Sequence, residues 1–452
     1  MAGTATAGAG TAVPGGASGE QASANGAVGR APGNVAELCL AARRASRVLA
    51  GVHTDTKNAA LEAIAASLGA NARQVLEANE RDMQTGVESG LGDALLDRLR
   101  LDAARLEAIA GAVRQIVALG DPIGEVIDGW RLPNGLDVRK VRVPLGVVAV
   151  IYEARPNVTI DATALCLKSG NAIVLRGSSM AAHSNAALAQ LAGDAATSAG
   201  LPEGSVVLVQ GGGREELGEL ARQSESVDLI IPRGGEQLKA ALEATARVPV
   251  IYAAAGNCHV YVDRAADLAR AETIVMNAKT QRPGVCNAAE KLLVHEQVAE
   301  RFLPTIAAAL GGAGVEVRAD ERAMAVLTEA GGADGVVAAR EEDWPEEYLG
   351  LTIAIGVVGS VEQAIEHIGR YGSGHSEAIV TADTAAARAF QLGVDAACVY
   401  VNASTRFTDG GEFGMGAEIG NSTQKLHARG PLGLRELTTY KYLVEGDGHV
   451  RV

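Results

Sequence analysis

Cys286 is the residue best suited to nucleophilic chemistry. It stands in QRPGVCNA, residues 281–288, directly after Pro283 and Gly284, and is one of five cysteines in the chain. A thiol with the ordinary pKa of about 8.5 is only slightly ionised at neutral pH, but its thiolate is a strong nucleophile. The proline and glycine interrupt a helical run, and the residues that follow are compatible with a new helix, whose N-terminus would stabilise a thiolate. The competing interpretation is a small apolar residue that fills a core.

The other four cysteines are predicted to be structural. Cys39, Cys166 and Cys398 lie inside apolar runs, and Cys258 stands at the start of a strand-like run. The five cysteines are scattered, odd in number and without the spacing of a zinc site, which argues against both a disulfide framework and a metal centre. We therefore expect a reducing, cytoplasmic environment and no bound metal.

A second constellation is YEARPNVTIDA, residues 152–162, in which Arg155, Pro156 and Asn157 end an apolar run. A side-chain amide at the carboxyl edge of a strand can donate to the oxyanion that forms when a nucleophile attacks a carbonyl. The same asparagine could instead cap the following helix. The residues alone leave both interpretations open.

Phosphate-binding features occur without the usual dinucleotide fingerprint. Neither QGGGREELG nor GMGAEIG has a third glycine at the spacing of the Rossmann motif. In VLRGSS, however, Arg176, Ser178 and Ser179 follow a strand-like run where a helix should begin. Backbone N–H groups, a guanidinium and two hydroxyls suit a phosphate group.

The elements that must position these residues form an α/β fold. From Val35 to about Leu119 the apolar spacing predicts several amphipathic helices, and a hairpin follows around the Pro133 turn. Buried strand-like runs then alternate with helices, which is typical of a doubly wound parallel sheet with a nucleotide at the carboxyl ends of its strands. The predicted strands of this first set are GVVAVIY, NAIVLRG, GSVVLVQ, VDLIIPRG and VPVIYA.

A second set of alternating strands and helices begins near Cys258 and predicts a second doubly wound α/β domain. Its strand-like runs are CHVYVD, EKLLVH, LTIAIGVV, EAIVT and CVYVN. The predicted organisation is a disordered Gly- and Ala-rich tail at 1–33, a cofactor-binding domain at 34–257 with a hairpin at about 127–145, a catalytic domain at 258–425, and a C-terminal segment at 426–452 that joins the hairpin as β structure.

Composition narrows the function further. Asp and Glu outnumber Lys and Arg by 54 to 40 in the 452 residues, and no basic run offers a footprint for a phosphate backbone, so we expect no nucleic-acid partner. No stretch approaches about 20 uncharged apolar residues, so we expect no membrane span. The tail lacks the apolar region of a signal peptide.

The motifs in this order resemble the aldehyde dehydrogenase superfamily and, within it, the γ-glutamyl phosphate reductase family. IYEARPNVTIDA, KTQRPGVCNAAEKLLVH and GEFGMGAEIGNSTQ carry the resemblance to that reductase family, and the similarity runs from about Val35 to the C-terminus. It implies an NADPH-dependent reduction of L-glutamyl 5-phosphate to L-glutamate 5-semialdehyde in proline biosynthesis. It also implies functional coupling to glutamate 5-kinase and a homo-oligomer built through the hairpin and the terminal strand.

The resemblance also assigns roles to individual residues. Cys286 matches the catalytic nucleophile, and Asn157 matches the oxyanion-hole asparagine that acts with the backbone N–H of the cysteine. The expected cofactor contacts are Arg176 at the adenosine ribose, Ser178 and Ser179 at the 2′-phosphate, Gly234 and Gly235 at the pyrophosphate, and Glu347 at the nicotinamide ribose. Arg282 is a candidate for an anionic group of the substrate; the alternative is a surface ion pair.

One departure from the superfamily bears on the reaction. Hydrolytic aldehyde dehydrogenases carry a glutamate that activates water against the thioester, and the corresponding stretch here, YAAAGNCHVYVD, has no carboxylate at that place. An enzyme that exchanges acyl groups with phosphate has no use for such a base. The alternatives are a hydrolytic NAD(P)-dependent aldehyde dehydrogenase and a non-catalytic nucleotide-binding protein that kept the fold.

Overall fold

The computed structural model describes residues 34–211, 213–252 and 255–451. The tail predicted at 1–33 lies outside the described residues. Within the described part, no helix is both long enough and apolar enough to cross a membrane.

Five helices precede the first strand, as the apolar spacing predicts. Asn34 and Asp102 cap the first and last of these helices through side-chain oxygens that accept backbone N–H groups. The bounds are α1 (Val35–Leu49), α2 (Thr54–Ala70), α3 (Ala72–Glu88), α4 (Asp93–Leu99) and α5 (Ala103–Ala118).

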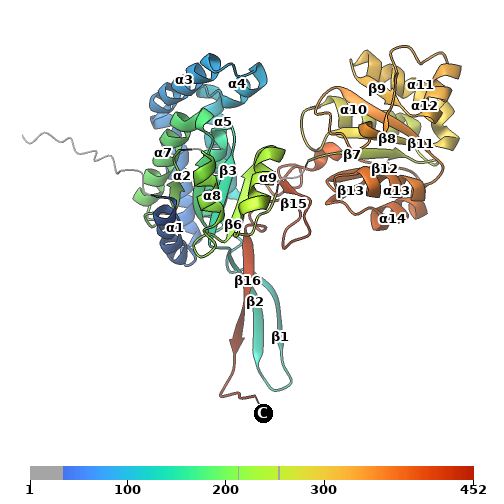
Figure 1. The fold of residues 1–452 in the computed structure, drawn as a ribbon. Helices are drawn as coiled ribbons and strands as arrows, with labels where there is room; N and C mark the ends of the chain where they lie inside the picture. The colour runs from blue at the N-terminus through green and yellow to red at the C-terminus, as the bar shows by residue number, and fades with distance from the viewer. Residues whose placement is uncertain (1–33, 212, 253–254, 452) are drawn as a thin grey trace, which may run out of the picture. The chain divides into compact units, whose positions relative to one another are not determined.

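The first parallel sheet has four strands in the order β5-β4-β3-β6. Helices α1, α6 and α7 pack directly against it, and α2 and α5 pack on α6 and α7 (Figure 1). Strands β3 and β4 are buried along their whole length, which explains their unbroken apolar sequences. The elements are β3 (Val147–Tyr152), α6 (Asn157–Lys168), β4 (Ala172–Gly177), η1 (Ser179–Ala181), α7 (Ala182–Ser198), β5 (Val206–Leu208), α8 (Arg214–Ala221), β6 (Leu229–Arg233) and α9 (Glu236–Thr245).

The strand predicted at VPVIYA is wrong. In the described part of this segment, residues 248–252, one isolated bridge, between Ile230 and Val250, is all that joins it to the sheet. Pro249 has no N–H to donate, and the N–H of Tyr252 donates to the side chain of Gln424 at 2.7 Å instead of to a strand. The side-chain oxygen of Gln424, from a distant segment, therefore takes the N–H that would continue the pairing with β6 beyond Val250.

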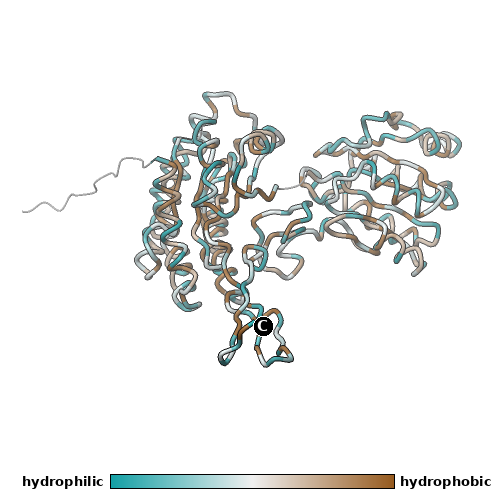
Figure 2. The backbone as a smooth tube through the Cα atoms, turned by 60° about the horizontal axis from the view of Figure 1, so that its bottom comes forward, coloured by the Kyte–Doolittle hydropathy of each residue, from teal (hydrophilic) through white to brown (hydrophobic). Residues whose placement is uncertain are grey.

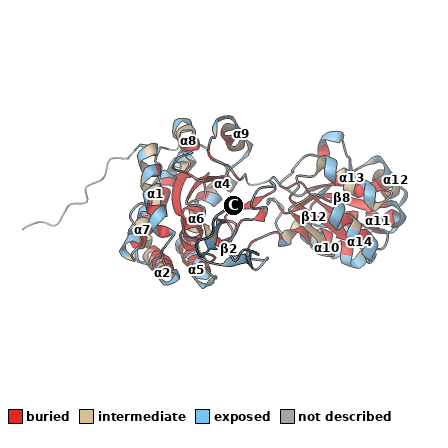
Figure 3. Cartoon of the chain, turned by 90° about the horizontal axis from the view of Figure 1, so that it is seen from below, coloured by how far each residue is buried: buried red, intermediate tan, exposed pale blue. Residues whose placement is uncertain are grey.

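The second parallel sheet has seven strands in the order β10-β9-β11-β8-β7-β12-β13. Leu292 and Val294 on β8 face one core with α10, α11 and α12, whereas Leu293 faces a second core with α13 and α14. This alternation buries the strands on both faces, as the red of β8 and β12 in Figure 3 shows. Figure 2 shows the hydropathy of the same chain, with brown marking its hydrophobic stretches. The elements are β7 (Cys258–Val262), α10 (Leu268–Thr280), β8 (Ala289–His295), α11 (Glu296–Gly312), β9 (Glu316–Ala319), α12 (Glu321–Glu329), β10 (Val337–Ala338), η2 (Glu341–Asp343), β11 (Thr352–Val358), α13 (Val361–Tyr371), β12 (Ser376–Val380), α14 (Thr384–Gly393), β13 (Cys398–Val401) and η3 (Thr405–Phe407).

A separate antiparallel sheet contains the predicted hairpin. Strands β1 (Val126–Arg131) and β2 (Asp137–Pro144) pair through a turn in which Gly135 has φ +96°, a conformation that favours glycine. The C-terminal strand β16 (Thr438–Glu445) pairs with β2 from Thr438 opposite Pro144 to Glu445 opposite Asp137.

The segment that leads to β16 packs on the first core. Leu432, Leu434 and Leu437 belong to the same apolar cluster as the four-stranded sheet. A short antiparallel pair precedes them, made of β14 (Asn421–Ser422) and β15 (Gly430–Pro431).

Candidate active site

Cys286 lies in a tight turn between α10 and β8. The N–H of Ala288 donates to the carbonyl of Val285 at 3.0 Å, so Cys286 and Asn287 are the two central residues of the turn. The chain then enters β8 and not a helix, and the prediction of a helix N-terminus beneath the thiolate is therefore wrong. Residues 289–295 form a strand and not a helix because they pair with β7 on one side and β11 on the other, in the middle of the parallel sheet.

The peptide group after Cys286 contacts the start of β7. The thiol of Cys258 donates to the carbonyl oxygen of Cys286 at 3.1 Å. A Cβ atom at Gly256 would lie 1.5 Å from the same oxygen, so only glycine fits there. Cys258 is buried, as predicted, and it also contacts the nucleophile's backbone, which its sequence context did not indicate.

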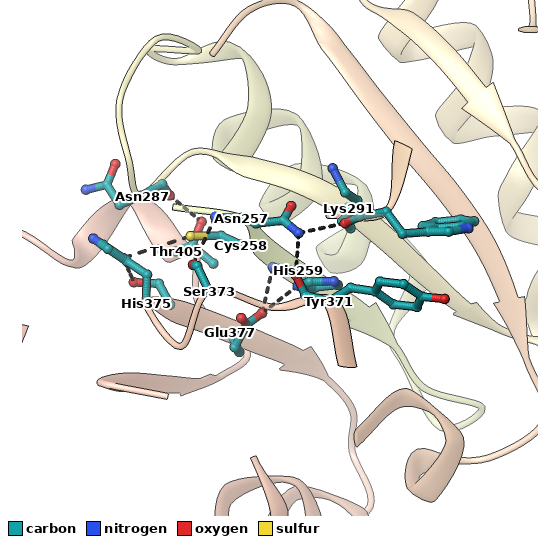
Figure 4. Close-up of polar contacts among 12 residues, drawn as sticks. Asn257, Cys258, His259, Asn287, Lys291, Tyr371, Ser373, His375, Glu377 and Thr405 are labelled. Carbon is teal, nitrogen blue, oxygen red and sulfur yellow. Dashed lines mark hydrogen bonds and ion pairs between the residues drawn. The ribbon is translucent and has the colours of Figure 1, made fainter. Parts of the chain in front are cut away.

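The other side of the turn is held by the segment after β13. Thr405 Oγ1 donates to the carbonyl of Asn287 at 2.7 Å, and Asn287 Nδ2 donates to the carbonyl of Thr408 at 2.9 Å. Figure 4 shows Asn287, Thr405 and Cys258 gathered around this turn. Contacts from segments 28 and more than 100 residues away along the chain thus fix the backbone of the nucleophile.

The thiol of Cys286 is half-buried and is not ionised in its resting surroundings. Its pKa is raised to about 11, mainly by burial and to a smaller extent by the nearby carboxylates of Glu347 and Glu418. Arg233 is the main influence in the opposite direction. Arginine charge, and not a helix dipole, is therefore what favours the thiolate here.

Asn157 is the first residue of α6, at the carboxyl end of β3. Its Nδ2 donates to Asp161 Oδ2 at 2.9 Å, one helical turn further on. An amide nitrogen carries two hydrogens, so this bond orients the group and leaves one N–H for another acceptor. Burial raises the pKa of Asp161 to about 6, and the Asn157 hydrogen bond opposes that shift. The i, i+4 spacing of the two residues was the sequence signal for this pair.

A cavity of about 280 Å³ lies at the carboxyl ends of β4 and β5. Ser178, Ser179, His183, Gln210 and Gly211 contribute to its lining. Ser178 Oγ is buried and has no hydrogen-bond partner among the described residues, so a ligand oxygen would satisfy it. The predicted serines thus line one cavity at the place where open α/β sheets bind nucleotides.

Arg176 takes a different position from the serines. Its Nη2 donates to the carbonyl of Gly213 at 2.7 Å and so ties the end of β4 to the loop before α8. In the structure the predicted ribose contact is thus engaged in shaping the glycine loop.

Gly234 and Gly235 lie between β6 and α9. A Cβ atom at Gly234 would lie 2.8 Å from both Glu153 Oε1 and Leu238 Cδ2, so the backbone there is close to its neighbours. Gly235 is the N-cap of α9, and the unpaired N–H groups of that helix end suit a pyrophosphate.

Glu347 belongs to the loop before β11, and its side chain reaches Gly256, which packs against the turn of Cys286. Its Oε1 accepts the N–H of Gly256 at 2.6 Å. Lys291 Nζ donates to the carbonyl of Glu346 at 2.7 Å and holds the same loop from β8. These contacts place Glu347 beside Cys286, as its effect on the pKa of the thiol also indicates.

A fully buried acid–base pair, Glu377 and His259, joins β12 to β7, one residue along β7 from Cys258. Glu377 Oε2 accepts the backbone N–H of His259 at 2.7 Å and lies 3.0 Å from His259 Nδ1 (Figure 4). Burial raises the pKa of Glu377 well above its ordinary value and lowers the pKa of His259 to about 3. Both side chains are therefore neutral, and a single proton is shared in the hydrogen bond between Glu377 Oε2 and His259 Nδ1. Among the described residues, no group of three or more His, Cys, Asp or Glu could hold a metal ion.

The two parallel α/β sheets and the cysteine on a turn before a central strand define the class of protein, and the chain belongs to the aldehyde dehydrogenase family, whose model matches residues 23–332. Within that family it belongs to the γ-glutamyl phosphate reductases. It is 56% identical over 410 residues to the γ-glutamyl phosphate reductase of Moorella thermoacetica, covering 91% of this chain and 97% of that protein. The reductase of Clostridium novyi is 51% identical over 417 residues, covering 92% and 99%.

Solved structures agree with this placement. The crystal structure of γ-glutamyl phosphate reductase from Thermotoga maritima superposes with a TM-score of 0.90 at 48% identity and covers 93% of this chain and all of that one. An acetylating aldehyde dehydrogenase from Geobacillus thermoglucosidasius has a TM-score of 0.64 at 18% identity, covering 92% and 97%, and shares the fold. The predicted α/β aldehyde dehydrogenase fold is confirmed.

Proposed function

We propose that the protein reduces L-glutamyl 5-phosphate to L-glutamate 5-semialdehyde and phosphate, in proline biosynthesis, through a thioester on Cys286. The observation that carries the mechanism is the turn of Cys286. Hydrogen bonds from Cys258 and Thr405 fix its backbone while the thiol stays half-buried. The reductase activity is that of relatives about half identical over nine-tenths of the chain.

The reaction begins when the Cys286 thiolate attacks the acyl carbon of the substrate. The C–O bond to phosphate breaks, phosphate leaves with the electron pair, and a thioester remains. The second N–H of Asn157 and the backbone N–H of Cys286 are assigned to the oxyanion of the tetrahedral intermediate, a contribution of about 3 to 4 kcal/mol per donor in comparable sites. Asp161 is a positioning residue, because it orients the Asn157 amide.

NADPH supplies the hydride when it is bound. Ser178 and Ser179 would hold its 2′-phosphate, Gly234 and Gly235 its pyrophosphate, and Glu347 its nicotinamide ribose. The buried, unpartnered hydroxyl of Ser178 and the N-cap position of Gly235 support this assignment. Arg176 would keep the glycine loop in place beside the adenosine.

The missing hydrolytic base separates this reaction from aldehyde oxidation by water. From Tyr252 onward the first carboxylate in the stretch is Asp263, which accepts from Tyr261 at 3.0 Å and from Thr381 at 2.7 Å and is therefore already engaged. Phosphate carries its own negative charge and attacks a thioester without such a base, whereas water without one reacts about 10²- to 10⁴-fold more slowly.

The test is the oxidation of glutamate semialdehyde with NADP⁺ in phosphate-free buffer. We expect a burst of about one NADPH per active site, from the thioester half-reaction, and steady turnover only after phosphate or arsenate is added. Cys286→Ala should show neither phase. Cys39→Ala, a cysteine control on α1 in the first core, should keep the burst. Sustained turnover without phosphate would assign the protein to the hydrolytic dehydrogenases.

Two wider expectations accompany the reaction. The five cysteines are all free, which suits a reducing compartment, and we place the protein in the cytoplasm. The acyl phosphate is a reactive product of glutamate 5-kinase, so functional coupling to that kinase would shorten its exposure to water. The exposed aromatic side chains of the β1–β2–β16 sheet support a homo-oligomer.

A further inference from the structure

Several arginines near Cys286 have no acidic partner. Arg155, Arg233, Arg282 and Arg406 form no ion pair among the residues that the structure describes, although acids outnumber bases by 54 to 40 in the chain. Arg282 lies close enough to Arg155 and Arg406 to lower the pKa of each, and both of these arginines also interact with Cys286. Positive charge is thus concentrated around the nucleophile, and the carboxylates that act on these arginines, Glu418 on Arg233 and Asp409 on Arg406, do so without forming an ion pair in the described part of the chain.

Arg406 is the member of this group that is most firmly fixed next to the nucleophile. It lies in η3, where its carbonyl accepts from Asn287 Nδ2 at 3.4 Å, and its neighbour Thr405 donates to the carbonyl of Asn287 at 2.7 Å. The backbone of Arg406 is therefore bound to the residue directly after Cys286 (Figure 4 shows Asn287 and Thr405).

The side chain of Arg406 is oriented by a neutral group. Its Nε donates to Gln281 Oε1 at 2.9 Å, and Gln281 precedes Arg282 in the sequence. Neither Nη atom of Arg406 has a partner among the described residues. A glutamine orients the guanidinium but does not neutralise it, so the two terminal nitrogens remain available to an anion.

The surroundings of Arg406 disfavour its positive charge unless an anion binds. Burial is the main reason that the pKa of Arg406 is lowered, and repulsion from Arg282 is the next. Asp409 is the acidic group that acts on Arg406, and its Oδ1 already accepts the N–H of Gly411 at 2.9 Å.

We propose that Arg406 and Arg282 form the phosphate site of the enzyme. They bind the phosphoryl group of the acyl phosphate in the forward reaction and inorganic phosphate in the reverse reaction. In the reverse step a phosphate oxygen attacks the thioester carbon, the C–S bond breaks, and its electron pair returns to Cys286 as the thiolate. This inference rests on the proposed function, because it names the group that the two arginines hold in that reaction.

The test separates the half-reaction that uses phosphate from the one that does not. Arg406→Gln should keep the phosphate-free burst and the KM for glutamate semialdehyde within about twofold, while the KM for inorganic phosphate rises about ten- to a hundredfold. Arg406→Lys should give an intermediate KM, because it keeps the charge and loses the fork of donors. Arg301→Gln, an exposed arginine on α11, is the control and should change nothing.

A binding measurement on the intact enzyme completes the test. Inorganic phosphate should slow alkylation of Cys286 in the unmodified enzyme and in Arg301→Gln, and this protection should disappear in Arg406→Gln and Arg282→Gln. An unchanged KM for phosphate with protection retained would overturn the proposal. A raised KM for the semialdehyde alone would also overturn it and would assign the arginines to the substrate α-carboxylate. Absence of a burst in the unmodified enzyme would instead reject the proposed function.

Discussion

At the scale of single residues, the reactivity of Cys286 depends on the competition between burial and arginine charge. Burial raises the pKa of the thiol to about 11, so at neutral pH the thiolate fraction grows in proportion to hydroxide concentration. We expect the rate of Cys286 alkylation by iodoacetamide to rise about tenfold per pH unit between about pH 8 and pH 10. A plateau that begins below pH 8 would contradict this expectation.

The same competition predicts the effect of Arg233. Arg233 is the main group that lowers the pKa of Cys286, so Arg233→Gln should raise that pKa further. The thiolate fraction at a given pH then falls, and alkylation at pH 8 should slow by several-fold. Arg301→Gln serves as the control for loss of one surface charge. An equal rate in Arg233→Gln would mean that solvent screens the arginine fully.

The buried pair of Glu377 and His259 predicts how stability varies with pH. The native state keeps Glu377 protonated well above its ordinary pKa of 4.5, at which the unfolded chain releases the proton. The stability that this group contributes is therefore fully present below about pH 4.5 and is lost as pH rises, by on the order of 1 kcal/mol per pH unit.

Glu377→Gln tests this linkage, because glutamine stays neutral at every pH and its side-chain oxygen can still accept from the backbone N–H of His259. The difference in Tm between the variant and the unmodified protein should shift in favour of the variant from pH 5 to pH 8. Glu300→Gln, on the exposed face of α11, should give a difference that does not change with pH. A constant difference for Glu377→Gln would show that the carboxyl group is ionised in the native protein.

At the scale of elements, the junction from β4 to α7 should determine cofactor preference. Ser179 begins η1 and lines the cavity together with Ser178 and His183. A carboxylate at this position would repel a 2′-phosphate, so Ser179→Glu should raise the KM for NADPH by about tenfold or more and affect NADH much less. The measurement is the ratio of kcat/KM for the two cofactors. Equal ratios before and after the substitution would place the 2′-phosphate elsewhere.

At the scale of the whole molecule, the β1–β2–β16 sheet should mediate self-association. Trp130 and Tyr442 are exposed, with ring centroids 6.2 Å apart, and Tyr440 and Val444 lie exposed beside them on β16. Exposed apolar side chains in one small sheet indicate an interaction surface. Trp130→Glu with Tyr442→Glu should reduce the mass measured by light scattering to that of a smaller assembly. Leu392→Glu, at a highly exposed position on α14, should leave the mass unchanged. A single-chain mass for the unmodified protein would refute the assignment.

Much of the fold was determined by local sequence. The three- and four-residue spacing before residue 119 predicts helices that the structure contains, and the apolar runs from GVVAVIY to CVYVN, apart from VPVIYA, coincide with its strands. Side-chain periodicity and turn residues act over a few positions, so they are readable in the sequence. The family and the reductase activity were accessible for the same reason, because the motifs around Cys286 and Asn157 are contiguous.

The tertiary structure decided what happens around those motifs. PGVCN leads into β8 rather than a helix, because pairing with β7 and β11 outweighs local helix preference. VPVIYA does not form the predicted strand, because the backbone N–H of Tyr252 donates to the side chain of Gln424, 172 residues away. Cys258 approaches the nucleophile because β7 and β8 begin side by side, and Thr405 and Arg406 do so because the segment after β13 contacts the residue that follows Cys286. Such long-range hydrogen bonds and charge effects have no periodic signature, so only the folded chain reveals them.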